Sequence, residues 1–302
     1  MTSSAEHFER WKAQQSAAEQ MIPLVGQLYR DNGVVIRIFG RPMLNNSAIG
    51  IIKAHRYALQ MVGEELSLRK SLELVQCMTQ MTLAPARVDL GKLCHGFMQE
   101  GGDPMAYLTG KLASINTGKS SILAEPQDIV LYGFGRIGRL LARMLIERVG
   151  DGNKMRLRAI VVRGGKEGDL KKRASLLRRD SVHGAFNGSI KVDEENKAII
   201  ANGVYIQVIY ANSPAEVDYT TYGIKNALVV DNTGMWRDET GLSQHLNCPG
   251  ASKVILTAPG KGDIKNIVYG VNHDDVTDKD KILSAASCTT NAITPVLKAI
   301  ND

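Results

Sequence analysis

Three glycines with the spacing of a dinucleotide-binding turn lie near the middle of the chain. The apolar run 128–132 leads directly into this Gly-x-Gly-x-x-Gly motif, and an amphipathic segment at 138–149 follows it. In a strand–turn–helix context Gly133 makes the tight turn, Gly135 lets the backbone approach a pyrophosphate, and Gly138 allows close packing of helix on strand. The helix N-terminus offers N–H donors and a positive partial charge to the phosphates. The motif therefore predicts a site for NAD or NADP.

The end of the second apolar run bears on which dinucleotide is bound. An NAD site has an acidic residue here, about 20 residues beyond the glycines, which grips the ribose hydroxyls. In this chain the run 157–162 ends instead at Arg163-Gly164-Gly165, 25 residues after Gly138. An arginine suits a 2′-phosphate, but a surface arginine with an acid elsewhere in the site fits the sequence equally well. The choice between NAD and NADP stays open.

A cysteine near the C-terminal end is a candidate nucleophile. Cys288 opens a helical run that extends to Asp302, and the hydroxyl residues Ser287 and Thr289 flank it. The dipole of a helix stabilises a thiolate at its N-terminus, which raises the nucleophilicity of the thiol at neutral pH. The flanking hydroxyls can donate hydrogen bonds to a phosphate. From residue type alone, a buried structural cysteine is the commoner role.

The elements that must position these residues fall into two regions. From Ala5 to about Met98, apolar residues recur near the 3.6-residue period of amphipathic helices. The second region alternates short β-branched runs with longer amphipathic ones, which predicts an α/β fold with a doubly wound, parallel, Rossmann-type sheet. The runs interpreted as strands are 128–132, 157–162, 204–209, 227–230 and 253–256. We expect a helical N-terminal extension at 1–125 and a dinucleotide-binding domain at 126–287.

The composition of the chain excludes several classes of protein. The 302 residues carry a net charge of +6, with 44% hydrophobic and 23% charged residues, which excludes a disordered or fibrous chain. Four cysteines are too sparse for a disulfide framework. No run approaches the roughly 20 apolar residues that span a bilayer, and the first residues lack the apolar core of a secretory signal. We expect a reduced, cytoplasmic protein with no membrane partner.

Three further patterns are weaker. The segment Ala113–Ser120 satisfies a relaxed phosphate-loop pattern, but no strand precedes it. The basic segment 154–179 could hold a nucleic acid, yet no aromatic residues interleave with its charges, so a solvated basic face beside the cofactor is favoured. The adjacent Cys94 and His95 cannot both face one ion. Neither nucleic acid nor a metal ion is an expected ligand.

The motifs together resemble phosphorylating glyceraldehyde-3-phosphate dehydrogenase. The resemblance rests on GFGRIGR at 133–139 and SCTTN at 287–291, and it continues through four other segments in the family's order. These segments are DSVHG (180–184), DNTG (231–234), KVILTAP (253–259) and YGVN (269–272). The resemblance covers about 127–302 and does not reach 1–125.

The resemblance implies an NAD- or NADP-dependent oxidation and phosphorylation of glyceraldehyde 3-phosphate. Cys288 matches the nucleophile that adds to the aldehyde carbon. After hydride transfer to the nicotinamide a thioester remains, which inorganic phosphate cleaves. Ser287 and Thr289 match positions that hydrogen-bond the substrate or the attacking phosphate. Arg136 and Ile137 match the backbone donors to the pyrophosphate. Thr233, Gly234 and Thr257 match residues that line the cofactor cleft.

The chain departs from the family's pattern at three places. Arg163 stands where the family has the ribose-binding acid, and Asn212 replaces an arginine on the adenine side. The chain also ends 14 residues after Cys288, whereas the family's catalytic domain continues with a general-base histidine, an asparagine that holds the nicotinamide and a loop that builds the tetramer. We therefore expect 288–302 to be the first helix of a truncated catalytic domain, and the complete protein to be a homo-oligomer.

Two other functions fit the same residues. An erythrose-4-phosphate dehydrogenase shares the glycine and cysteine motifs. A non-catalytic regulatory protein that binds the cofactor is the expectation if the chain truly ends at Asp302. The helical extension at 1–125 is not needed for the chemistry. We therefore expect it to serve in regulation, oligomerisation or docking.

Overall fold

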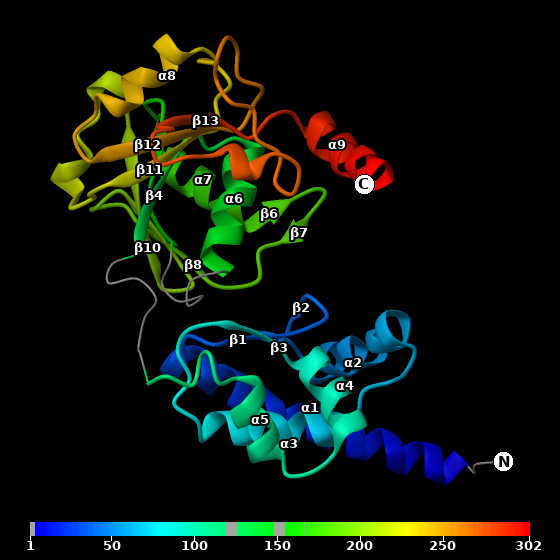
Figure 1. Ribbon diagram of the computed structural model, residues 1–302. Helices are drawn as coiled ribbons and strands as arrows, with labels where there is room; N and C mark the ends of the chain where they lie inside the picture. Colours follow the sequence, from blue (N-terminus) through cyan, green and yellow to red (C-terminus); the bar gives the residue numbers. More distant parts are fainter. Residues whose placement is uncertain (1–3, 119–125, 148–154, 166) are drawn as a thin grey trace. The chain divides into compact units, whose positions relative to one another are not determined.

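The fold consists of two compact units. The computed structural model describes, in Figure 1, residues 4–118, 126–147, 155–165 and 167–302. We call residues 4–118 the N-terminal unit and the described residues from 126 onward the C-terminal unit. Three predictions fall partly outside the described residues. They concern the boundary near Glu125, the end of the helix expected at 138–149, and the last two residues of the relaxed phosphate-loop pattern.

The N-terminal unit combines helices with a small sheet. Its long first helix, α1, packs on α2 and α3 through an apolar stripe at helical spacing. The buried residues of this stripe are Ala17, Ala18, Met21, Val25 and Leu28. The elements of the unit are α1 (Ser4–Asn32), β1 (Val35–Ile38), β2 (Arg41–Pro42), α2 (Ala48–Val62), α3 (Leu68–Thr79), β3 (Arg87–Asp89), α4 (Leu90–Glu100) and α5 (Pro104–Lys111).

The sequence analysis did not predict the sheet of this unit. Strand β1 pairs antiparallel with β2 and parallel with β3. A tight turn at Phe39 and Gly40, both with positive φ, joins β1 to β2. Strand β1 is only four residues long, so the helical period of the surrounding sequence concealed it. The region is mainly helical, as expected, with this sheet added.

The C-terminal unit is built on an eight-stranded sheet. Its larger elements are β4 (Gln127–Tyr132), α6 (Arg136–Glu147), β5 (Met155–Val162), α7 (Asp169–Arg178), β8 (Ile190–Asp193), β9 (Ala198–Ala201), β10 (Val204–Tyr210), β11 (Ala227–Asp231), α8 (Glu239–Leu246), β12 (Ala251–Leu256), β13 (Ile282–Ser284) and α9 (Cys288–Asn301). Smaller elements are the strand pair β6 (Arg179–Asp180) and β7 (Gly184–Ala185), and the 3₁₀ turns at Pro214–Glu216, Tyr219–Tyr222 and His273–Asp275.

The strand order confirms the predicted fold class. The sheet runs β13-β12-β11-β4-β5-β10-β9-β8. The first six strands are mutually parallel, and β9 and β8 add an antiparallel edge. Taken in chain order, the six parallel strands follow the 3-2-1-4-5-6 arrangement of a doubly wound dinucleotide-binding sheet. The order reverses between β4 and β11, so this is where a ligand crevice is expected.

Both faces of the sheet are buried, which explains the continuous apolar runs in the sequence. In β4, Ile129 and Leu131 pack in a cluster with α6 and α7, which lie side by side (Figure 1). Val130 and Tyr132 point to the opposite face and pack around Tyr219. Among the described residues, no helix is long and apolar enough to cross a bilayer.

Candidate functional site

The predicted site residues follow the carboxyl ends of neighbouring parallel strands. The register aligns Val161, the last residue but one of β5, with the last residues of four strands, Tyr132, Asp231, Leu256 and Ser284. The loops after these strands carry, in the same order, Arg163, Gly133, Thr233, Thr257 and Cys288. At about 4.8 Å per strand, the row extends roughly 19 Å along one edge of the sheet. An extended ligand laid on this edge would meet all five loops.

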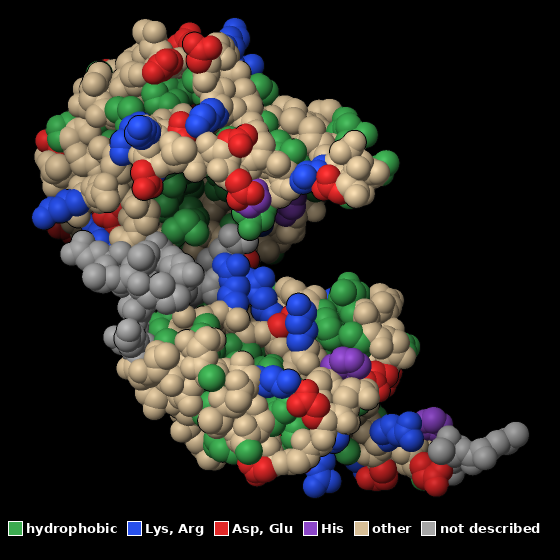
Figure 2. Space-filling view, viewed as in Figure 1, with side chains coloured by type: hydrophobic (Ala, Val, Ile, Leu, Met, Phe, Trp, Pro, Cys, Tyr) green, Lys and Arg blue, Asp and Glu red, His purple; other side chains and the backbone are tan. Residues whose placement is uncertain are grey.

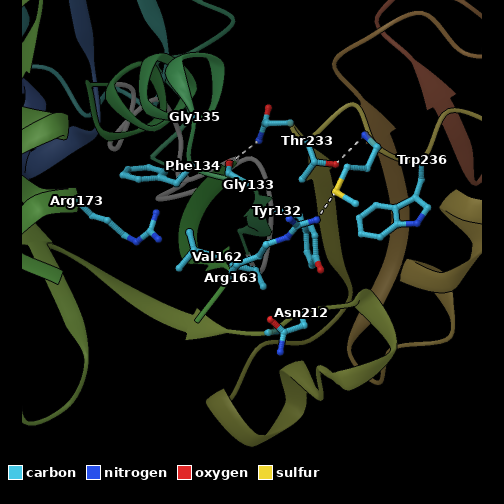
Figure 3. A pocket seen from close by; sticks show the side chains of 14 residues that line it. Tyr132, Gly133, Phe134, Gly135, Val162, Arg163, Arg173, Asn212, Thr233 and Trp236 are labelled. Atoms are coloured by element: carbon cyan, nitrogen blue, oxygen red, sulfur yellow. Dashed lines mark hydrogen bonds between the residues drawn. The ribbon is translucent and has the colours of Figure 1, made fainter. Parts of the chain in front are cut away.

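A cleft of about 460 Å³ opens at the point where the strand order reverses (Figure 3). Its fourteen lining residues come from the ends of β4, β5, β10 and β11 and from the segments that follow them. Two of them, Arg163 and Arg173, are cationic, and none is acidic. The cleft therefore suits an anionic ligand with flat apolar parts, for which Phe134 and Trp236 provide aromatic surface.

The glycine motif at the cleft is packed tightly at two of its three positions. Gly133 has a φ of +91°, and a Cβ there would lie 2.9 Å from Thr233 Cγ2. A Cβ on Gly138 would lie 2.3 Å from the carbonyl oxygen of Gly133, so only glycine lets α6 pack this closely. At Gly135 a Cβ would meet nothing within 4 Å. Gly135 lines the cleft, and the open space beside it is where a pyrophosphate would fit.

The first turn of α6 completes this anion-binding geometry. Arg136 and Ile137 begin the helix and are exposed. They are not among the residues that line the cleft. If they contribute to anion binding, they do so through their backbone N–H groups, because the N–H groups of a first helical turn lack intrahelical partners. Arg139, one turn further, donates from Nη1 to the carbonyl oxygen of Phe134 at 3.4 Å and ties the loop to the helix.

Arg163 reaches across the cleft. Its Nη2 lies 2.7 Å from the sulfur of Met235, so the side chain passes from the end of β5, beside Tyr132 at the end of β4, to the segment after β11 (Figure 3). Arg173 approaches from α7, where Asp169 accepts a hydrogen bond from its Nε at 2.6 Å. The hydroxyl of Tyr210 donates to the same carboxylate at 3.3 Å. The sequence analysis missed Arg173, whose place at the cleft depends on the packing of α7.

The segment after β11 forms the far wall of the cleft. Both the N–H and the hydroxyl of Thr233 donate to Asp231 Oδ1 at 2.7 Å, and the Thr233 hydroxyl accepts from the N–H of Met235 at 3.1 Å. Gly234 has a φ of +65° and turns the chain between them. Asn232 donates from Nδ2 to the carbonyl oxygen of Gly133 at 3.4 Å, which links this wall to the glycine turn.

Thr257 lies beneath this wall and does not line the cleft. Its hydroxyl donates to the carbonyl oxygen of Asp231 at 3.0 Å and lies 3.2 Å from Asn232 Oδ1. Its N–H also donates to the Asp231 carbonyl, at 2.9 Å. Asn212, which follows β10, lines the cleft, and its N–H donates to Glu216 Oε2 at 2.9 Å.

The candidate nucleophile stands at the start of α9. Cys288 is exposed and is the first residue of the helix. Ser287 caps the helix, because its Oγ accepts from the N–H of Thr290 at 2.9 Å, while Thr289 is exposed. A buried neighbour, Ser284, accepts from the N–H of Ala286, whose φ is +57°. Cys288 is thus held on a tight turn after the edge strand β13, outside the residues that line the cleft.

Part of the basic segment 154–179 forms ion pairs within the unit. Arg156 and Arg158 on β5 both pair with the buried Asp128 of β4, and Arg173 pairs with Asp169. On the face shown in Figure 2, acidic and basic side chains of the C-terminal unit are intermixed. These contacts account for three of the arginines that suggested a polyanion site.

The comparisons with known proteins agree with this geometry. Residues 127–239 match the model of the "Glyceraldehyde 3-phosphate dehydrogenase, NAD binding domain" family, in agreement with the expected cofactor, NAD or NADP. A glyceraldehyde-3-phosphate dehydrogenase-like protein of Pseudomonas aeruginosa is 58% identical over 286 residues, which cover 93% of this chain and 62% of the relative. Glyceraldehyde-3-phosphate dehydrogenases of Zymomonas mobilis and Streptococcus pyogenes are 39% and 35% identical over 57% of this chain and 48% of their own lengths.

Two of these alignments have the length expected for residues 127–302, and the third extends the resemblance further. A match over 93% of the chain must extend into residues 1–125, which the sequence motifs did not connect to any relative. The chain spans about half to three-fifths of the length of these relatives. The family match on the C-terminal unit, its strand order and the two motifs at 133–139 and 287–291 lead to one conclusion. The chain is similar to members of the glyceraldehyde-3-phosphate dehydrogenase family, and its residues 127–239 match that family's NAD-binding domain.

Proposed function

We propose that the C-terminal unit binds NAD or NADP across the carboxyl edge of its sheet and supplies Cys288 for the oxidation and phosphorylation of glyceraldehyde 3-phosphate. The order of the loops along this edge carries the proposal. Asn212 and Arg163 lie at one end, Gly133 and Thr233 at the strand reversal, and Cys288 follows the far edge strand. This order suits a dinucleotide whose adenine end and nicotinamide end point in opposite directions.

The residues of the cleft fit the cofactor. The open space beside Gly135 and the first turn of α6 would receive the pyrophosphate. The rigid wall made by Asp231 and Thr233 would lie along the nicotinamide half. When bound, the nicotinamide supplies the hydride acceptor for the oxidation.

The chain's own contribution to the chemistry is the nucleophile and its surroundings. The thiolate of Cys288 would attack the aldehyde carbon, forming a C–S bond and leaving a hemithioacetal oxygen. Loss of hydride from that carbon leaves a thioester, and attack by inorganic phosphate releases an acyl phosphate and returns the thiolate. Thr289, exposed beside Cys288, is placed to donate a hydrogen bond to a phosphate group. Ser287 already caps the helix through Oγ, so its part is to fix the thiol's position.

We further propose that NADP is preferred over NAD. The cleft contains two arginines and no acidic lining residue, and an acid at the end of β5 is what a free ribose hydroxyl requires. The Arg163 guanidinium is held by a weak sulfur acceptor, so a 2′-phosphate could take its place as a stronger partner.

The exposed thiol also supports a reducing, cytoplasmic location, because exposed free cysteines are unsuited to oxidising compartments. Homo-oligomerisation remains part of the proposal on the strength of the family resemblance. Light scattering of the purified protein would measure the oligomeric state.

The test is to titrate the purified chain with NAD and with NADP by calorimetry, and then to assay turnover in the complete protein. We expect dissociation constants in the micromolar range and oxidation of glyceraldehyde 3-phosphate that needs inorganic phosphate. Cys288→Ser should abolish turnover and keep dinucleotide affinity within about threefold. A chain that binds neither dinucleotide at millimolar concentration contradicts the proposal. Faster oxidation of erythrose 4-phosphate, or binding without any turnover, would favour one of the two alternative functions.

A further inference from the structure

A fully buried histidine–aspartate pair lies directly behind the wall of the cleft. Asp231, the last residue of β11, and His245, on α8, are both 0% exposed, and His245 Nε2 lies 3.0 Å from Asp231 Oδ2. The α8 helix that carries His245 is capped by Asp238, whose side chain accepts from the N–H of Gly241, and it packs on β12. The pair therefore connects a helix on one face of the sheet with a strand end at the cleft.

The second carboxylate oxygen of Asp231 is the anchor of the cleft wall. Oδ1 accepts two hydrogen bonds from Thr233, and the Thr233 hydroxyl accepts one from Met235. With Oδ2 held by His245, the carboxylate has one orientation in which all these bonds form. The position of the Thr233 side chain, which lines the cleft, is fixed through Asp231 by a residue that does not line it.

The imidazole ring also supports two aromatic lining residues. Tyr132 and Trp236 both line the cleft and make edge contacts with the His245 ring, at centroid separations of 4.7 Å and 5.9 Å. Among the described residues, His245 Nδ1 has no hydrogen-bond partner. The neutral ring with its proton on Nε2 satisfies this arrangement, because the proton is donated to Asp231 and only a lone pair is left unpaired.

We infer that Asp231 and His245 form a buried positioning pair for the dinucleotide cleft, with His245 acting through Asp231 and never touching the ligand. The inference rests on the proposed dinucleotide site and adds to it a device that holds the Thr233 wall in its binding position. Loss of the His245 donor would leave a buried carboxylate oxygen unsatisfied. Asp231 would then be free to turn, and its hydrogen bonds to Thr233 would weaken.

Two substitutions at His245 separate the hydrogen bond from the packing. His245→Phe keeps a ring against Tyr132 and Trp236 but removes the donor, and we expect it to weaken binding of the preferred dinucleotide by about tenfold. His245→Gln restores an N–H donor, and binding should stay within about threefold of wild type. Leu242→Ala is the control, because Leu242 is also fully buried on α8 but packs toward β12. It should lower the thermal midpoint and leave affinity within about threefold.

The results decide between this inference and the proposed function. If wild type binds neither NAD nor NADP, the proposed site fails. If wild type binds and His245→Phe binds equally well, only the positioning role is wrong. If His245→Phe and Leu242→Ala have the same thermal midpoint and weaken dinucleotide binding equally, the positioning role is also wrong. Should His245→Phe not fold, NMR of wild type provides the test. The inference predicts a His245 ring protonated at Nε2. It also predicts that the NMR signals of the Thr233 amide and the His245 ring shift when the dinucleotide is added, and signals that do not shift contradict it.

Discussion

At the scale of single residues, Gly135 differs from the other two glycines of its motif. A Cβ added at Gly135 would meet no atom within 4 Å, whereas one added at Gly133 or Gly138 would lie within 3 Å of a neighbouring atom. The packing of the protein itself therefore does not require glycine at 135. In the proposed site, the ligand's phosphates approach the backbone here, and this makes Gly135 the most direct probe of the proposal.

We predict that Gly135→Val raises the dissociation constants of NAD and NADP at least about tenfold, because the side chain fills the space of the pyrophosphate. The fold has room for this side chain, so the thermal midpoint should stay within about 2 °C of wild type. Gly110→Val on α5 is the matched control, since a Cβ there also meets nothing within 4 Å. Calorimetric titration checks the prediction, and wild-type affinity in Gly135→Val would place the pyrophosphate elsewhere.

Arg163 carries the predicted choice between the two cofactors. Arg163→Ala should weaken NADP binding by about tenfold, as expected for the loss of about 1.4 kcal/mol from a charge-assisted hydrogen bond. Binding of NAD should change by no more than about threefold. Lys191→Ala, an exposed site on β8, removes the same charge from the unit away from the cleft and serves as the control. Equal losses for both dinucleotides would show that Arg163 does not contact a 2′-phosphate.

At the scale of elements, the approach of α6 to β4 sets the shape of the turn between them. Gly138→Ala would place a methyl group 2.3 Å from the carbonyl oxygen of Gly133, and backbone cannot rotate away as a side chain can. We predict a loss of about 1–3 kcal/mol in the free energy of unfolding of the C-terminal unit, with weaker dinucleotide binding. Gly110→Ala, in a helix with open space, should be neutral or slightly stabilising. Denaturant titrations of both variants measure the difference, and an unchanged midpoint in Gly138→Ala would contradict the packing role.

The sequence predicted the elements that bury continuous apolar runs and missed those that depend on partners. Strands β4, β5, β10, β11 and β12 were predictable because each is covered on both faces and is rich in β-branched residues. Strands β13 and β8 are short and partly exposed, and β9 is buried but only four residues long, so none of them was predicted. The glycine motif could be recognised in the sequence because its three glycines lie close together along the chain.

The pair of Asp231 and His245 could not be predicted in this way. The two residues are separated by 14 positions and meet only because α8 folds back across the end of β11. The one local signal was a carboxylate at the end of an otherwise apolar strand, and burial raises the cost of leaving such a group unpaired. Arg173 and Trp236 are similar cases, because their places at the cleft follow from the packing of α7 and from the turn after Gly234.

At the scale of the whole molecule, each unit has its own hydrophobic core. One buried cluster lies wholly within the N-terminal unit, and the other three lie within the C-terminal unit. Units with separate cores can unfold in separate transitions. A group that titrates within one core should therefore change the stability of that unit alone.

His55 is such a group in the N-terminal unit. It is 1% exposed, its Nδ1 donates to the carbonyl oxygen of Ile51 at 2.8 Å, and burial lowers its pKa from 6.5 to about 4. The unfolded chain therefore binds a proton between pH 6.5 and 4 that the folded unit does not. Stability conferred by neutral His55 is complete above pH 6.5 and is lost as the pH falls to about 4, by about 3 kcal/mol in all.

We predict that calorimetry will resolve a transition of the N-terminal unit whose midpoint falls as the pH is lowered through this window. His55→Leu should flatten that pH dependence, because the leucine has no proton to bind in either state. The transition of the C-terminal unit, identified by its upward shift with added dinucleotide, should respond equally to pH in wild type and variant. A pH dependence of the first transition that survives His55→Leu would assign it to other groups, and a single transition for the whole chain would show that the two cores unfold together.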